Sequence, residues 1–154
     1  MDIDELTDAI NMTPYSSDAY LDRGAEYYKQ KKYDEALSDF EKALELNPLS
    51  STAYYDRALC YYHRDRDYEK VLIDLAKAIG LSDYLDSSFE LRGKIYLQFE
   101  KYDDAIADFT KAIEINPNCF DYYVNRAYAY LKGFELYHFA IEDYSQALKL
   151  SPNN

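Results

Sequence analysis

The chain has 154 residues, a net charge of −12 and an apolar share of 48%. The negative charge argues against a nucleic-acid-binding surface and against an anionic membrane, because both need basic residues. The sequence has no apolar run near about 18 residues, and its acidic start, MDIDELTDAI, lacks the features of a secretory signal. The two cysteines, Cys60 and Cys119, form no disulfide pattern, so a reducing, cytoplasmic setting is expected.

Five landmark positions recur four times along the chain, at steps of 34 or 35 residues. Each set has a small residue, a tyrosine, a second tyrosine, a bulky apolar residue and an alanine. Repetition with this period is typical of solenoids built from helix pairs, so an all-α solenoid is predicted. In repeat order the positions are Gly24, Ala58, Gly93 and Ala127; Tyr27, Tyr61, Tyr96 and Tyr130; Tyr33, Tyr68, Tyr102 and Tyr137; Phe40, Leu75, Phe109 and Tyr144; and Ala43, Ala78, Ala112 and Ala147.

The first 16 residues have the spacing of the second half of a repeat. We therefore predict a short helix from about Ile3 to Met12 that caps the first full repeat. In that repeat, Ser17 or Asp18 is a good N-cap for a first helix that runs to about residue 30. A second helix is predicted over about 34–46, because Pro48 discourages its continuation. The predicted divisions are 1–16, 17–50, 51–85, 86–119 and 120–154.

The second repeat departs from the regular pattern in its internal turn and at its C-terminal end. It has one extra residue in the turn HRDRD, as the fourth repeat has in KGFELY. It also has Asp83 where a closing proline is expected, with Gly80 shortly before. Two alternatives follow: either its second helix ends early at Gly80, or the next helix gains a turn from Ser82 or Asp83.

This pattern resembles the tetratricopeptide repeat family over essentially the whole chain. Besides the landmarks, the chain has the family's opening aromatic residues, its second-helix alanines and its closing prolines, with Val71 as one departure. The resemblance implies antiparallel helix pairs in a right-handed superhelix, whose first helices line a concave groove that receives a peptide or a helix of a partner protein. The residues that carry it are Tyr20, Tyr54, Phe89 and Tyr123; Ala36, Ala105 and Ala140; and Pro48, Pro117 and Pro152.

An arginine precedes the small residue in every repeat, and an aspartate precedes the bulky residue. The arginine fork matches a carboxylate, so we predict a structural ladder of Arg–Asp pairs, formed within repeats or between them. The alternative is a row of arginines that captures an acidic ligand. The residues are Arg23, Arg57, Arg92 and Arg126, with Asp39, Asp74, Asp108 and Asp143.

A second set of first-helix residues is expected on the groove side, by projection of the family's geometry. An apolar and aromatic strip at such a place typically marks an interaction site. The alternative is that neighbouring helices or an oligomer contact cover it. The expected groove residues are Leu21, Asp22, Ala25, Tyr28, Tyr55, Asp56, Leu59, Tyr62, Glu90, Lys94, Leu97, Val124, Asn125, Tyr128 and Leu131, flanked by Asp18 and Asp121.

The expected function is therefore non-catalytic binding of another protein or peptide. Because aspartates flank the groove, an apolar segment that carries lysine or arginine is the expected ligand. The rival is an assembly module that acts through its ends, including self-association through the C-terminal helix. The resemblance also implies that some members of the family bind acidic chaperone tails through a clamp of lysine and asparagine on successive first helices. Leu21, Ala25 and Asp56 stand at those positions here, so a chaperone-tail adaptor is disfavoured.

Catalytic and metal sites have little support in the sequence. His63 and His138 lie near turns of different repeats and form no ligand motif. Paired acids such as Asp103 and Asp104 open a helix, where acids suit the helix dipole. No nucleotide-binding or nucleophile motif occurs, so no cofactor is expected.

Overall fold

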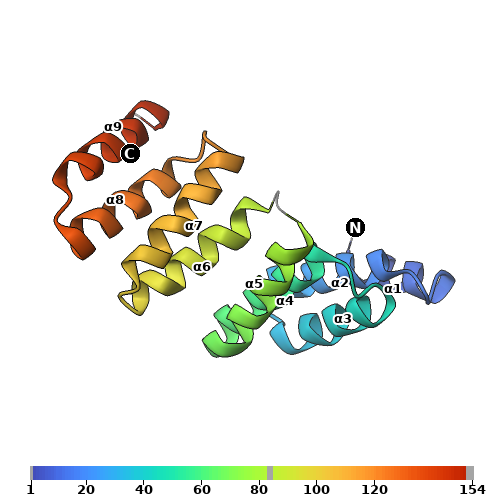
Figure 1. Ribbon diagram of the computed structural model, residues 1–154. Coiled ribbons are helices and arrows are strands. Elements are labelled where there is room, and N and C mark those ends of the chain that lie inside the picture. The colour runs from blue at the N-terminus through green and yellow to red at the C-terminus, as the bar shows by residue number, and fades with distance from the viewer. Residues whose placement is uncertain (1, 83–84, 152–154) are drawn as a thin grey trace. The chain divides into compact units, whose positions relative to one another are not determined.

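The computed structural model describes residues 2–82 and 85–151 and contains nine helices in these ranges (Figure 1). The chain divides into two compact units, residues 1–82 and 83–154. Helices α1 (Ile3–Met12), α2 (Ser17–Lys29), α3 (Tyr33–Leu46), α4 (Ser51–Arg64) and α5 (Tyr68–Leu81) belong to the first unit. Helices α6 (Asp86–Gln98), α7 (Tyr102–Ile115), α8 (Phe120–Phe134) and α9 (Tyr137–Leu150) belong to the second.

The helices pack as antiparallel pairs in chain order, which confirms the predicted all-α class. Helix α2 packs chiefly on α3, α4 on α5, α6 on α7 and α8 on α9. Within the first unit α1 lies on α2 and α3 lies against α4, and within the second α7 lies against α8 (Figure 1). Each helix therefore buries its apolar residues on its sequence neighbours, as a solenoid requires.

The N-terminal helix has the bounds predicted for it, Ile3–Met12. Asp2 and Glu5 form a capping box at its start, and Leu6 and Ile10 are buried. At the next helix the expected cap is wrong by one residue. Ser16, not Ser17 or Asp18, accepts the bond from the Ala19 N–H, while the Ser17 hydroxyl donates to the carbonyl of Ala43, 3.0 Å away.

The end of the second repeat corrects both sequence alternatives. Helix α5 continues through Gly80 to Leu81, and the Ser82 N–H still donates to the carbonyl of Ala78 at 3.1 Å. Helix α6 begins only at Asp86, so it does not start at Ser82. The cost of one glycine, about 1 kcal/mol, does not stop a helix that buries Val71, Leu75 and Ala78. Asp83 and Pro152 lie outside the described residues.

Each turn inside a helix pair has a non-glycine residue in the left-handed region, two positions before the second tyrosine landmark. This conformation costs about 1–2 kcal/mol for most residues, and glycine alone adopts it freely. The sequence does not mark these positions, because charged residues occupy them. They are Lys31, Arg66, Glu100 and Glu135, with φ of 59°, 55°, 57° and 52°.

Candidate functional site

The four predicted arginines each form a two-pronged pair with the aspartate of the same helix pair. In each, Nε donates to one carboxylate oxygen at 2.8 Å and Nη2 donates to the other at 2.7–2.8 Å. The aspartates are buried, and the arginine side chains are about one fifth exposed. The pairs are Arg23–Asp39, Arg57–Asp74, Arg92–Asp108 and Arg126–Asp143.

Two of these arginines also reach the preceding helix. Arg23 Nη1 donates to Thr7 Oγ1 at 3.1 Å, and Arg126 Nη1 donates to Thr110 Oγ1 at 3.0 Å. The bond to Asp108 raises the pKa of Arg92, while burial raises the pKa of Asp108 against the opposing effect of that arginine. A ligand carboxylate would have to displace a buried aspartate from a bidentate pair, so this geometry favours the structural alternative.

The predicted groove residues of unit 1 divide into covered and partly open positions. Leu21 is partly buried and packs on the cluster of Ala43, Leu44 and Ala53, to which α4 contributes Ala53. The ring of Tyr28 lies 5.9 Å from the rings of both Tyr33 and His63, and burial raises its pKa to about 12. These two residues therefore belong to the seam between consecutive helix pairs.

Asp22 lies beside an open pocket of unit 1. Leu6, Ala25 and Lys29 complete the lining of this pocket, whose volume is about 270 Å³. On α4, Tyr55, Asp56, Leu59 and Tyr62 are each only partly buried. We call Asp22, Ala25, Tyr55, Asp56, Leu59 and Tyr62 the α2–α4 face.

Asp56 differs from the ladder aspartates in its surroundings. Burial raises the pKa of its carboxyl group to about 6 from an ordinary 3.8, and no neighbouring cation opposes this rise. Among the described residues, each of the four ladder aspartates is paired with an arginine, whereas Asp56 forms no ion pair. A partly desolvated carboxylate of this kind gains free energy when a cation is brought to it.

The groove positions of unit 2 are more varied. Leu97 packs on the cluster of Ala105, Phe109 and Ala129. Lys94 Nζ donates to Glu90 Oε1, so its charge is already matched. Val124 lines a pocket together with Phe120, Tyr144, Ala147, Leu148 and Ser151. Asn125 and Leu131 are partly buried, and Tyr128 is 43% exposed.

Sequence reasoning missed this last pocket and one polar cluster. Asp86 Oδ2 accepts bonds from Tyr122 Oη at 2.9 Å and from Asn116 Nδ2 at 3.0 Å, so it joins the starts of α6 and α8 to the end of α7. The sequence carried a signal for this cluster, because Asp86 stands at the position that Ser17 and Ser51 occupy in the earlier repeats. Within the described residues no three metal-ligating side chains gather, and His63 lies exposed on α4 near its end.

Models of one family match most of the chain. Their description is Tetratricopeptide repeat, and the matches cover residues 17–48 and 89–119, 39–72, and 120–154. None of the helices in 2–82 and 85–151 is long and apolar enough to cross a lipid bilayer.

Two curated relatives show the range of proteins that share this sequence pattern. RNA polymerase II-associated protein 3 of Rattus norvegicus is 28% identical over 100 residues, 65% of this chain and 15% of that protein. Hsp70-Hsp90 organizing protein 2 of Arabidopsis thaliana is 29% identical over 105 residues, 68% of this chain and 18% of that protein. The chain thus spans less than a fifth of either relative.

Solved structures of low identity share the fold. A structure of MamA has a TM-score of 0.84 at 23% identity, and the match covers 97% of this chain and 86% of the MamA chain. A structure of Pseudomonas aeruginosa pilF has a TM-score of 0.78 at 20% identity, and the match covers 90% of this chain and 62% of that chain. At these identities the likeness concerns the fold alone.

Proposed function

Because the chain belongs to the tetratricopeptide repeat family, we propose that it is a protein-protein interaction module whose working surface includes the α2–α4 face. Its ligand is a peptide or helix of another protein that carries a lysine or arginine among apolar residues. The burial of the Asp56 carboxylate without a cationic partner is the observation that supports a basic ligand most directly. A cationic side chain placed against it would give this partly buried carboxylate the partner that each ladder aspartate already has.

The neighbours of Asp56 suit the rest of such a ligand. Tyr55 and Leu59 lie on the same helix at helical spacing, and Ala25 and Leu6 line a pocket between α1 and α2 together with Asp22. Aromatic and aliphatic side chains contribute most of the binding free energy at interfaces, while the charges set specificity and speed association. The net charge of −12 also favours a basic partner over an acidic one.

An acidic chaperone tail is not the proposed ligand, although one relative is named for an organising role toward Hsp70 and Hsp90. Leu21 and Ala25 offer no positive charge, and Asp56 would repel a carboxylate at neutral pH. The four ladder arginines are engaged by aspartates and cannot replace the missing clamp.

An affinity pull-down from lysate tests the surface. We expect wild type to retain a partner that the Tyr55→Ala/Tyr62→Ala variant loses. Tyr15→Ala is the matched control, since Tyr15 is 86% exposed and lies outside the α2–α4 face. Circular dichroism establishes that all three chains fold alike. Equal retention by the double variant would contradict the proposal and move the binding surface elsewhere.

A further inference from the structure

An open pocket of unit 2 lies between the start of α7 and the end of α8. Its volume is about 360 Å³. Asp103 and Asp104 of α7 line one part of it, and Gly133 and Phe134 of α8 line another. All of its lining residues lie within 100–134, so none of them belongs to the last helix, α9. We call it the α7–α8 pocket.

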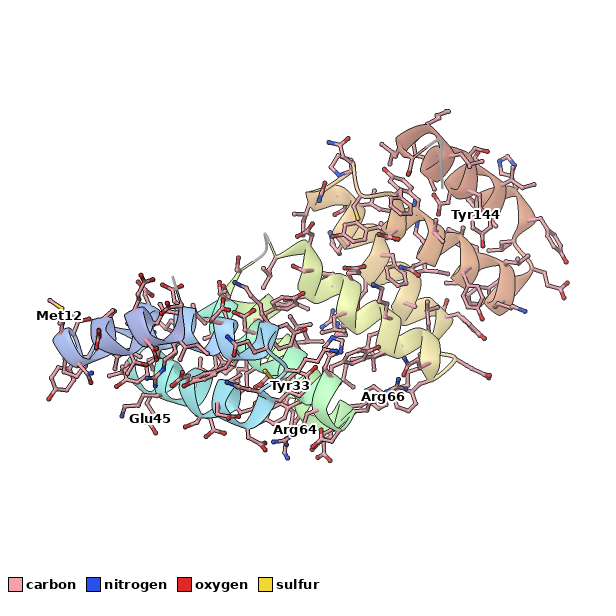
Figure 2. All side chains as sticks on the ribbon, turned by 180° about the vertical axis from the view of Figure 1, so that it is seen from behind. Met12, Tyr33, Glu45, Arg64, Arg66 and Tyr144 are labelled. Carbon is pink, nitrogen blue, oxygen red and sulfur yellow. The ribbon has the colours of Figure 1, made fainter. Side chains whose placement is uncertain are left out.

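In unit 1 an arginine connects the same two kinds of helix. Arg64 is the last residue of α4 (Figure 2), and its Nη1 donates to Oδ1 of Asp34, at the start of α3, at 2.8 Å. Its Nε and Nη2 donate to Asp65 Oδ2 at 3.1 and 3.0 Å. The guanidinium also lies 5.7 Å from the centroid of the Tyr61 ring. Two thirds of the Arg64 side chain is therefore covered, with an exposed fraction of 32%.

Unit 2 lacks this bridge because two residues differ. The second and fourth repeats share the extra residue in the internal turn, so their positions correspond one to one. In the order unit 1 then unit 2, the equivalents are Arg64 and Gly133, Asp65 and Phe134, and Asp34 and Asp103. The aspartate of the second helix is thus retained, whereas the arginine that would reach it is replaced by glycine. The α7–α8 pocket corresponds to the space that the Arg64 side chain crosses in unit 1.

The chain does not supply a cation to this pocket from position 133. A Cβ atom on Gly133 would lie 2.6 Å from Cβ of Tyr102, so α8 approaches α7 too closely for a larger residue. Among the described residues, neither Asp103 nor Asp104 forms an ion pair. The lysine of the lining, Lys101, has its Nζ 5.8 Å from the centroid of the Tyr96 ring. The two aspartates therefore remain available to a cation from outside.

The lining suits a guanidinium group better than an ammonium group. Glu100, Asp103 and Asp104 supply three carboxylates, and Tyr102 and Phe134 supply aromatic rings. Phe134 is 43% exposed. A guanidinium stacks on aromatic rings and offers five donors in a fixed plane, whereas an ammonium is compact and more strongly hydrated. The chemistry of the lining therefore favours arginine over lysine.

We propose that the α7–α8 pocket binds an arginine side chain of a partner protein, with an apolar neighbour of that arginine packed on Phe134. The arginine takes in unit 2 the place that Arg64 has in unit 1. Exposed ion pairs contribute little binding free energy, so the rings supply most of it and the carboxylates set the preference for arginine. A second copy suits the pocket less well, because two chains of charge −12 repel each other.

Nuclear magnetic resonance titration of the isotope-labelled full chain with the peptide acetyl-GLRLG-amide tests the proposal. We expect saturable shifts of the backbone amides of 100–104 and 133–134. The amides of 31–35 should not shift, because Arg64 already bonds to Asp34 there. The same peptide with citrulline, which has the shape of arginine but no charge, and the same peptide with lysine should each bind at least about fivefold more weakly.

Asp103→Asn/Asp104→Asn should weaken the binding of the arginine peptide by at least about fivefold, because it removes both carboxylates of α7. Glu114→Gln/Asp121→Asn is the matched control, since it removes two charges from exposed positions of unit 2 outside the pocket and should leave binding unchanged. Asp22→Asn/Asp56→Asn should also leave the shifts of 100–104 unchanged. The pocket shares no residue with the α2–α4 face, so failure of one site is distinguishable from failure of the other.

Absence of saturable shifts at 100–104 and 133–134 overturns the proposal. Equal affinity for the arginine, lysine and citrulline peptides also overturns it, and this comparison needs no variant chain that has to fold. Circular dichroism establishes that the two double variants fold like wild type, and equal binding by a folded Asp103→Asn/Asp104→Asn variant counts against the site. A wild-type dimer in sedimentation equilibrium that Arg66→Ala disperses would overturn the partner assignment, since an arginine of a second copy would then fill the pocket.

Discussion

Gly93 lies so close to Phe109 that a Cβ built on it would be 2.9 Å from the Cζ atom of that ring. Gly24 has the same relationship to Phe40, at 2.6 Å from Cε1. The other two repeats place alanine at this position, Ala58 and Ala127, and their bulky residues are Leu75 and Tyr144 instead of phenylalanine. The close approach of the ring explains glycine in the two phenylalanine repeats and alanine beside the smaller Leu75, whereas the pairing of Ala127 with Tyr144 does not follow from side-chain size.

Gly93→Ala should therefore destabilise the chain although alanine is the better helix former. Overpacking costs about 1–3 kcal/mol, which exceeds the propensity gain of about 1 kcal/mol. Adding Phe109→Leu should recover part of the loss. Urea unfolding of wild type, Gly93→Ala and Gly93→Ala/Phe109→Leu measures the free energy of unfolding of each chain. Gly80→Ala is the control, because no atom lies within 4 Å of a Cβ at Gly80, and it should raise stability by about 0.5–1 kcal/mol. Equal effects at the two glycines would contradict the packing account.

Asp108→Ala should lower the free energy of unfolding by about 2–3 kcal/mol. The change leaves the guanidinium of Arg92, 23% exposed, without its bidentate partner. The loss is smaller than the roughly 3–5 kcal/mol of a fully buried pair because water reaches this arginine. Glu114→Ala on the same helix breaks an exposed ion pair with Lys111 and should cost less than about 1 kcal/mol. Equal losses for the two variants would count against the ladder as a stabilising element.

The two cysteines should differ sharply in reactivity. Cys60 is fully buried, and burial raises the pKa of its thiol to about 12, whereas Cys119 is partly exposed. Only the thiolate reacts with a disulfide reagent. Reaction of the native chain with a disulfide reagent should therefore label Cys119 quickly, and Cys119→Ser should abolish that fast phase. Rapid labelling of Cys60 in the native chain would show that α4 opens locally.

Asp56→Asn should stabilise the chain at pH 7.5 by about 1–2 kcal/mol, and this gain should shrink as the pH falls toward 4. The pKa of Asp56 is about 6 in the folded chain and near 3.8 when unperturbed. At pH 7.5 the charged carboxylate is therefore a cost to folding, and protonation through pH 6 relieves it. Urea unfolding of wild type and variant at several pH values isolates this group. A difference that does not change with pH would contradict the burial of Asp56.

The Arg–Asp pairs could be predicted from the sequence because both members recur at every repeat and because a buried carboxylate needs a matched cation. The surroundings of the expected groove residues were harder to predict. Helical spacing places Leu21 and Leu97 on the groove side of their helices, but the sequence does not show that each also packs on a buried cluster to which the next helix contributes an alanine. The end pocket was missed because Phe120 looks unremarkable until its position is compared with Ser17, Ser51 and Asp86. The left-handed turn residues have no sequence signal, because Lys31 and its equivalents carry ordinary charged side chains.

Selection of a random peptide library on the full chain, followed by titration of the enriched peptides, tests the central proposal most directly. The account predicts enriched peptides in which lysine or arginine stands among apolar residues. Their affinity should fall by at least about tenfold in Asp22→Asn/Asp56→Asn, should weaken as the pH falls through 6, and should be unchanged in Tyr15→Ala. Enrichment of acidic peptides, or equal affinity for the double asparagine variant, would contradict a basic ligand on the α2–α4 face.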